Sequence, residues 1–69
     1  MKFNELTDEE VRSGVGKIRV KGFTGNFGTL IEVDESDDFT VVFRWDDPAI
    51  PDSIGYKMHV RIEVLPKEV

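Results

Sequence analysis

The residues that could carry chemistry are few in this chain of 69 residues, and they do not converge on one segment. There is no cysteine, so a disulfide, a zinc-held mini-domain and a cysteine nucleophile are all excluded. The one histidine, His59, alternates with Lys57 and Arg61, and these like charges disfavour the cationic form that a general base must adopt. The serines, none of which stands in a nucleophile-elbow context, are Ser13, Ser36 and Ser53. We therefore predict no catalytic residue, and the chain is not expected to be an enzyme.

Three segments resemble ligand sites only superficially. The acidic run 34–38 lacks the glycine and the distal glutamate of a calcium-binding EF-hand loop, so we interpret it as a solvated turn. Asp46 and Asp47 precede Pro48, which is an ordinary way to begin a loop. The glycine-rich turn 22–28 lacks the lysine and the following helix of a phosphate-binding loop. We predict neither a metal site nor a cofactor.

The layout of charge is more informative than its total. The formal net charge is −5, which argues against non-specific binding of DNA as the main role. Bases nevertheless collect on two alternating segments, and if the last strand pairs with the first they would form one basic stripe. Its members are Lys17, Arg19, Lys21, Lys57, His59 and Arg61. The alternative is that these long side chains only cover barrel walls and protect strand edges.

Two further surfaces are candidates for binding. Aromatic side chains could gather at one rim of the fold, where they offer a large contact area at low entropic cost. They are Phe23, Phe27, Trp45 and Tyr56, and we assign Trp45, together with Phe43, mainly to the core. The acidic alternative surface comprises Asp34, Glu35, Asp37, Asp38, Asp46 and Asp47.

A short helix is predicted over about residues 8–13. Thr7 and Glu10 have the spacing of a capping box, and Leu6 and Val11 have that of a hydrophobic staple. Glycines at 14 and 16 then end the helix. We interpret it as a cap that shields one end of a barrel; a helix that docks a partner is the alternative.

From residue 17 onward the apolar side chains alternate with polar ones, which predicts strands. The strongest is 39–45, with Phe39, Val41, Phe43 and Trp45 on one face. In 29–34 we place Thr29, Ile31 and Val33 together and Leu30 on the opposite face. The other expected segments are a strand at 17–21, a loop at 46–55 and a strand at 56–62, closed by Pro66. Four or five short strands of this kind describe one domain, a small closed antiparallel barrel over about residues 16–66.

Residues 20–30, which read VKGFTGNFGTL, resemble the KOW motif of ribosomal proteins and transcription elongation factors. Gly25, Gly28 and Phe23 stand where that motif has its second glycine, its last glycine and its aromatic residue. The resemblance implies a five-stranded Src-homology-3-like barrel in which the glycines allow a sharp turn and Phe23 plugs the barrel mouth. It also implies a ribosome or an RNA polymerase as the larger assembly to which the chain binds.

Two functions follow from these observations. The first is a non-catalytic adaptor that binds a protein, or alternatively RNA, through the aromatic rim and the basic stripe. The second is a small acidic inhibitor, suited to a bacteriophage, that mimics phosphates to occupy a nucleic-acid-binding or defence protein. The first fifteen residues contain acids and no apolar run, and no stretch approaches the roughly 18 apolar residues of a membrane span, so we expect a cytoplasmic location.

Overall fold

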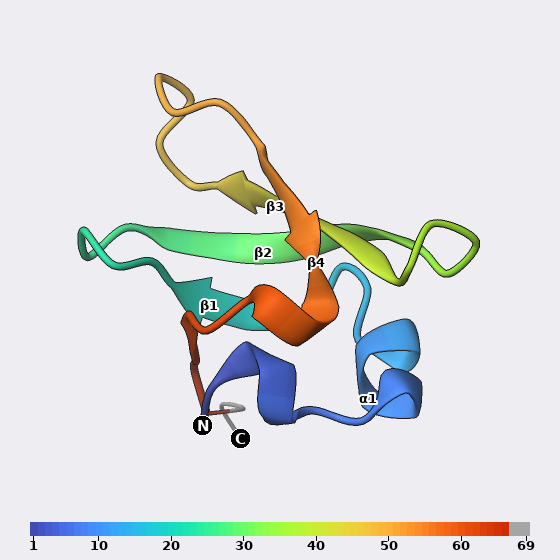
Figure 1. Ribbon diagram of the computed structural model, residues 1–69. Helices are drawn as coiled ribbons and strands as arrows, with labels where there is room; N and C mark the ends of the chain where they lie inside the picture. The colour runs from blue at the N-terminus through green and yellow to red at the C-terminus, as the bar shows by residue number, and fades with distance from the viewer. Residues whose placement is uncertain (67–69) are drawn as a thin grey trace.

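The computed structural model describes residues 1–66, and it is mainly β. Five antiparallel strands form one curled, half-barrel sheet in the order β4-β3-β2-β1-β5 (Figure 1). The expected antiparallel strands and the short N-terminal helix are therefore confirmed. In chain order the elements are η1 (Phe3–Glu5), α1 (Asp8–Ser13), β1 (Arg19–Lys21), β2 (Phe27–Asp34), β3 (Thr40–Trp45), β4 (Ser53–Tyr56), η2 (Lys57–His59) and β5 (Glu63–Val64). No helix among these described residues has the length and apolar character needed to cross a membrane.

The helix α1 forms where the capping signals predict it. The Thr7 side chain accepts a hydrogen bond from the Glu10 amide at 3.1 Å, and the Thr7 amide donates to the Glu10 carboxylate at 2.9 Å. These two bonds satisfy amides that a helix start otherwise leaves unpaired. The bond from the Thr7 amide also lowers the pKa of Glu10. Leu6 and Val11 are both buried, so the helix contributes its apolar side to the core below the sheet (Figure 1).

The core contains a residue that the alternation pattern did not indicate. Phe3 is completely buried, and its ring meets that of Phe43 edge to face at a centroid distance of 5.0 Å. The Phe3 amide donates to the carbonyl of Ile62, and Lys2 forms a bridge with Glu63, so the N-terminus lies beside β5. The other buried core residues are Leu6, Val11, Val20, Leu30, Val41 and Ile62.

Two strands differ in detail from the expected alternation. In β3, Val41 and Phe43 are buried as predicted, and Phe39 and Trp45 pack against them. In β2 the predicted faces are wrong, because the pairing register shifts between Leu30 and Glu32 and Leu30 is fully buried. Such a bulge places one extra residue in the strand and exchanges the faces beyond it.

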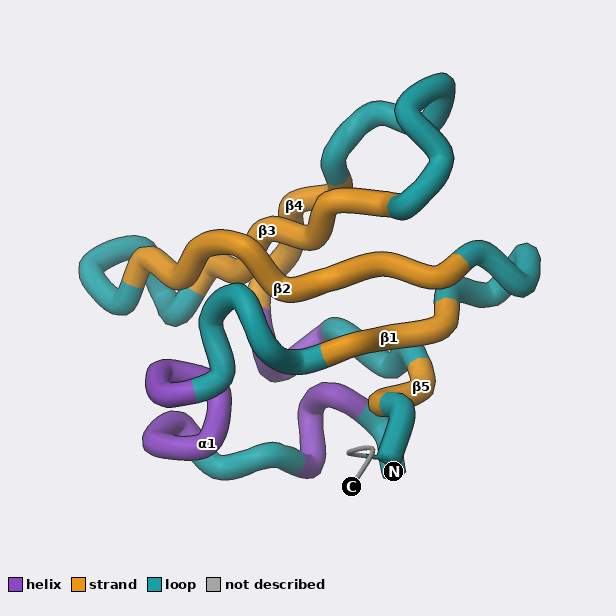
Figure 2. The backbone as a smooth tube through the Cα atoms, turned by 180° about the vertical axis from the view of Figure 1, so that it is seen from behind, coloured by secondary structure: helices purple, strands orange, loops and turns teal. Residues whose placement is uncertain are grey.

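The predicted continuous strand over 56–62 is wrong. β4 ends at Tyr56 and a 3-10 turn follows over Lys57–His59. In the chain after that turn, the strand that pairs with β1 is β5, Glu63–Val64 (Figure 2). Beyond the β3–β4 pairing, the Lys57 amide donates to the carbonyl of Phe39, the residue before β3, at 3.0 Å. Val60 and Ile62 still pack on the core, but from a segment outside the regular strands. The alternation therefore identified Val60 and Ile62 as inward, but it was wrong for Tyr56 and Met58, which are exposed, and for Lys57, which is largely buried.

Candidate functional site

An apolar groove lies between the turn after β1, strand β4 and the segment that follows η2. Its volume is about 400 Å³, and no aspartate or glutamate among the described residues lines it. We call it the Trp45 groove. It is lined by Gly22, Phe23, Thr24, Asn26, Phe43, Trp45, Ile50, Ser53, Ile54, Gly55, His59, Val60, Arg61 and Ile62.

The turn after β1 holds Phe23 out of the core. The Gly22 amide donates to the Asn26 carbonyl at 2.7 Å and the Gly25 amide donates to the Gly22 carbonyl at 3.0 Å, so residues 22–26 form a closed turn. Gly25 has a φ of 90°, a conformation that residues with a side chain rarely adopt. Phe23 is 83 % exposed, so the expectation that it plugs the barrel mouth is wrong.

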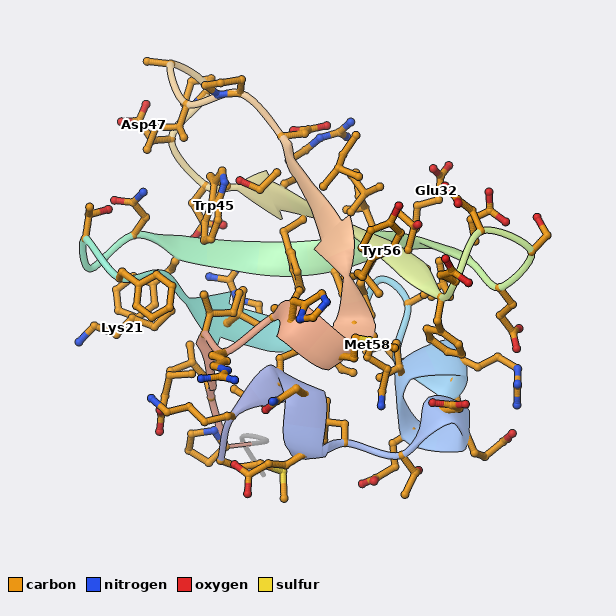
Figure 3. The ribbon with its side chains drawn as sticks, in the orientation of Figure 1. Lys21, Glu32, Trp45, Asp47, Tyr56 and Met58 are labelled. Atoms are coloured by element: carbon orange, nitrogen blue, oxygen red, sulfur yellow. The ribbon has the colours of Figure 1, made fainter. Side chains whose placement is uncertain are left out.

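The ring of Trp45 packs directly against the glycines of this turn. A Cβ atom added at Gly28 would lie 2.6 Å from Cε3 of the Trp45 ring, and one added at Gly22 would lie 3.1 Å from Cη2. These two glycines therefore serve as the surface against which the indole packs. Its Nε1 donates to Ser53 Oγ at 2.9 Å, which fixes the ring at the end of β3 (Figure 3).

Two nitrogen-bearing side chains, those of His59 and Arg61, line the same groove. Within residues 1–66 Arg61 has no carboxylate partner. His59 lies near Tyr56, with ring centroids 6.5 Å apart. Ser53 lines the groove too, but its hydroxyl accepts from Trp45, and no hydrogen bond joins it to His59 in the described part of the chain.

The predicted basic stripe does not form. Its second row was expected on a strand paired with the first, but Lys57 and His59 lie in η2 and β5 contains no base. Arg19 binds Asp46 through both guanidinium NH groups, at 2.8 and 2.6 Å, which lowers the pKa of Asp46. Lys57 is only 14 % exposed; it pairs with Asp8 at 3.3 Å and lies over the Phe39 ring. Lys17, before β1, and Lys21, within it, have no carboxylate partner among the described residues.

The predicted aromatic rim is divided between separate surfaces. Phe23 and Trp45 line the Trp45 groove, whereas Phe27, 45 % exposed, lines a second hollow with Lys17 and Arg19. Tyr56 lies on the side of β4 away from Trp45 in the view of Figure 3. Only Phe23 and Trp45 are brought together as expected.

The acidic residues are partly neutralised within the chain. Arg12 donates to both carboxylate oxygens of Glu35, which lowers the pKa of Glu35. Asp34 accepts from the amide and hydroxyl of Ser36, and Asp47 accepts from the Ala49 amide. Asp37 and Asp38 are exposed and have no ion-pair partner among residues 1–66. In that same range no group of three or more His, Cys, Asp or Glu side chains could hold a metal ion.

Sequence reasoning did not identify the aliphatic members of the groove. Ile50 and Ile54 lie in or beside the proline-containing loop, and Ile54 remains 72 % exposed. An isolated apolar residue in a loop has no period that would reveal its surroundings. The predicted loop over 46–55 is also wrong at its end, because β4 begins at Ser53 and includes Ile54.

Comparison of the chain with protein-family models, with curated proteins and with solved structures finds no match.

Proposed function

We propose that the chain is a non-catalytic interaction module that binds a protein segment in the Trp45 groove. The observation that carries this proposal is Phe23, which is 83 % exposed at a groove that already contains Trp45. Full burial of a phenylalanine side chain is worth roughly 1.5–3 kcal/mol, which this fold forgoes. Exposed apolar groups of this kind mark interaction sites when they rim a concave surface.

We propose that the curled sheet, whose edges are β4 and β5, belongs to a Src-homology-3-like barrel, an architecture suited to this role. The strand order β4-β3-β2-β1-β5 brings the last strand against the first, as such a barrel requires. The turn that resembles the KOW motif supplies Phe23 and the glycines beneath Trp45. A ribosomal or RNA polymerase assembly, reached in the cytoplasm, is the setting that this resemblance favours.

A protein is favoured over nucleic acid as the partner. The groove is lined mostly by apolar side chains, and a net charge of −5 repels a polyanion. Two of the six basic-stripe residues are also engaged by carboxylates, Arg19 by Asp46 and Lys57 by Asp8. A continuous basic track along a phosphate backbone therefore receives little support.

The acidic inhibitor is the second candidate, and one observation favours it. Asp37 and Asp38 project from the β2–β3 turn without an ion-pair partner in the described chain. Glu35 and Asp46 are already bound by arginines, which leaves fewer carboxylates free to mimic phosphates.

The test is affinity capture, in which the immobilised chain retains proteins from a lysate of the cells that encode it. The wild-type protein is compared with Phe23→Ser in the groove, and with Phe27→Ser as an exposed aromatic control outside it. Loss of captured proteins with Phe23→Ser alone supports the groove. If both phenylalanine variants capture the same proteins as wild type, and a variant with Asp37 and Asp38 changed to asparagine loses them, the result supports the inhibitor instead.

A further inference from the structure

We infer that the occupant of the Trp45 groove is an extended protein segment in which an apolar side chain stands next to a carboxylate that binds Arg61. This inference rests on the proposed function and specifies the chemistry of the partner. It follows from the contrast between the charge of the groove and the charge of the rest of the molecule.

The groove is free of acids in a protein that is rich in them. The chain has 14 acidic and 9 basic residues, yet no described acid lines the groove, and Arg61 and His59 do. Elsewhere the described arginines are matched by carboxylates: Arg12 by Glu9 and Glu35, Arg19 by Asp46, and Arg44 by Asp52. Arg61 is the one arginine without such a partner in residues 1–66.

The chemistry of Arg61 specifies a carboxylate. A guanidinium group presents a planar fork of NH donors that matches the two oxygens of a carboxylate. Arg61 is exposed at the groove, so its guanidinium is open to a carboxylate of the bound segment, beside apolar lining residues that include Val60 and Ile62. Phe23 and Trp45 provide the contact surface for the neighbouring apolar side chain.

The size of the groove favours a peptide segment. A volume of about 400 Å³ accommodates one or two side chains and not a folded surface. A single-stranded nucleic acid could stack a base on Phe23, but it would need several cations along its backbone. The groove offers one arginine and a histidine, in a molecule whose net charge is −5.

The experiment starts from selection of a phage-displayed library of random peptides on the wild-type chain and, in parallel, on Phe23→Ser. We expect the wild-type chain to enrich peptides with an aromatic or large aliphatic residue beside Asp or Glu. A selected peptide and its counterpart with Asn or Gln at the acidic position are then synthesised. Their binding to wild type, Arg61→Gln and Lys17→Gln is measured by fluorescence polarisation. Lys17→Gln removes the same charge from an exposed residue that does not line the groove.

The carboxylate peptide should lose roughly tenfold in affinity on Arg61→Gln and little on Lys17→Gln, as expected for loss of a charge-assisted hydrogen bond. The amide peptide should be insensitive to Arg61→Gln, which makes the coupling specific to this pair. Thermal unfolding of each variant confirms that it is folded.

Other outcomes separate the two proposals. Apolar peptides without an acidic preference, or an equal loss with both charge variants, overturn the carboxylate inference and leave the groove as a binding site. Equal enrichment on wild type and Phe23→Ser overturns the proposed function itself. An oligo-uridine probe that binds more tightly than the selected peptides, and loses this binding on Phe23→Ser, would identify RNA as the occupant. Dimerisation that Phe23→Ser abolishes would identify a second copy of the chain. Either result overturns the inference.

Discussion

Substitution of Gly28 by alanine tests whether the glycine-rich turn exists to seat Trp45. Gly28 pairs with Trp45 across β2 and β3, and an added Cβ would lie 2.6 Å from Cε3 of the indole and 3.0 Å from the Arg44 carbonyl oxygen. Because the carbonyl belongs to the sheet, the indole must move, and the Nε1 bond to Ser53 must lengthen or break. Overpacking of this kind costs roughly 1–3 kcal/mol, offset by about 0.5–1 kcal/mol for removing a glycine from a strand.

The expected net loss of roughly 1–2 kcal/mol corresponds to a decrease in Tm of roughly 5–15 °C for a domain of this size. Thermal unfolding by circular dichroism measures it, and tryptophan emission reports the indole directly, because Trp45 is the one tryptophan in the chain. Gly25→Ala is the matched control. Gly25 has a φ of 90° and no atom within 4 Å of an added Cβ, so this change costs backbone strain of roughly 1–2 kcal/mol without moving Trp45. If Gly28→Ala retains both the wild-type Tm and the wild-type emission, the turn does not seat the indole.

Four further changes have definite expected outcomes. Phe3→Ala should destabilise the fold by roughly 3–5 kcal/mol in chemical denaturation, since the ring is fully buried against the core; a loss below 1 kcal/mol would show that the N-terminal turn is dispensable. Asp38→Gly should raise Tm, because Asp38 has a φ of 51° and glycine relieves a cost of roughly 1 kcal/mol; no increase would mean that the turn is unstrained. Arg19 lowers the pKa of Asp46 in the folded state, so the stability from this pair is present above the ordinary carboxyl pKa of about 4 and is lost as the pH falls through the lowered value. Asp46→Asn should therefore flatten the acid limb of a stability–pH curve, and an unchanged limb contradicts the assignment. Phe23→Ser should leave stability within about 0.5 kcal/mol of wild type, because the ring is exposed; a larger loss would place Phe23 in the core.

The parts of the fold that local chemistry determines were predictable from the sequence. Thr7 and Glu10 identify the start of α1 because a capping box involves only neighbouring residues. Val41 and Phe43 identify the buried face of β3 because alternation is a local consequence of extended backbone. Both predictions are confirmed.

The errors arise where distant contacts decide the backbone. The bulge after Leu30 depends on pairing with β3, and the 3-10 turn at Lys57 depends on contacts with Asp8 and Phe39. Phe3 is buried because the N-terminal segment lies beside residues 60–63, which no local period reveals. The candidate site shares this limitation, since Trp45, Ile54 and Arg61 come from three separate segments.

In the turn 22–28 the glycines are needed for the fold, whereas Phe23 is the most exposed large apolar side chain of the described residues. Gly22 and Gly28 are explained by the close approach of Trp45, and Gly25 by its positive φ. Phe23 is explained by neither, because replacing it with a polar residue would remove little from the core and would improve its contact with water. Folding does not require the Phe23 side chain, yet a closed turn holds it beside an acid-free groove. A partner that covers the ring would explain why an apolar residue stands there. Stability and binding are therefore expected to respond to different residues of the same short turn.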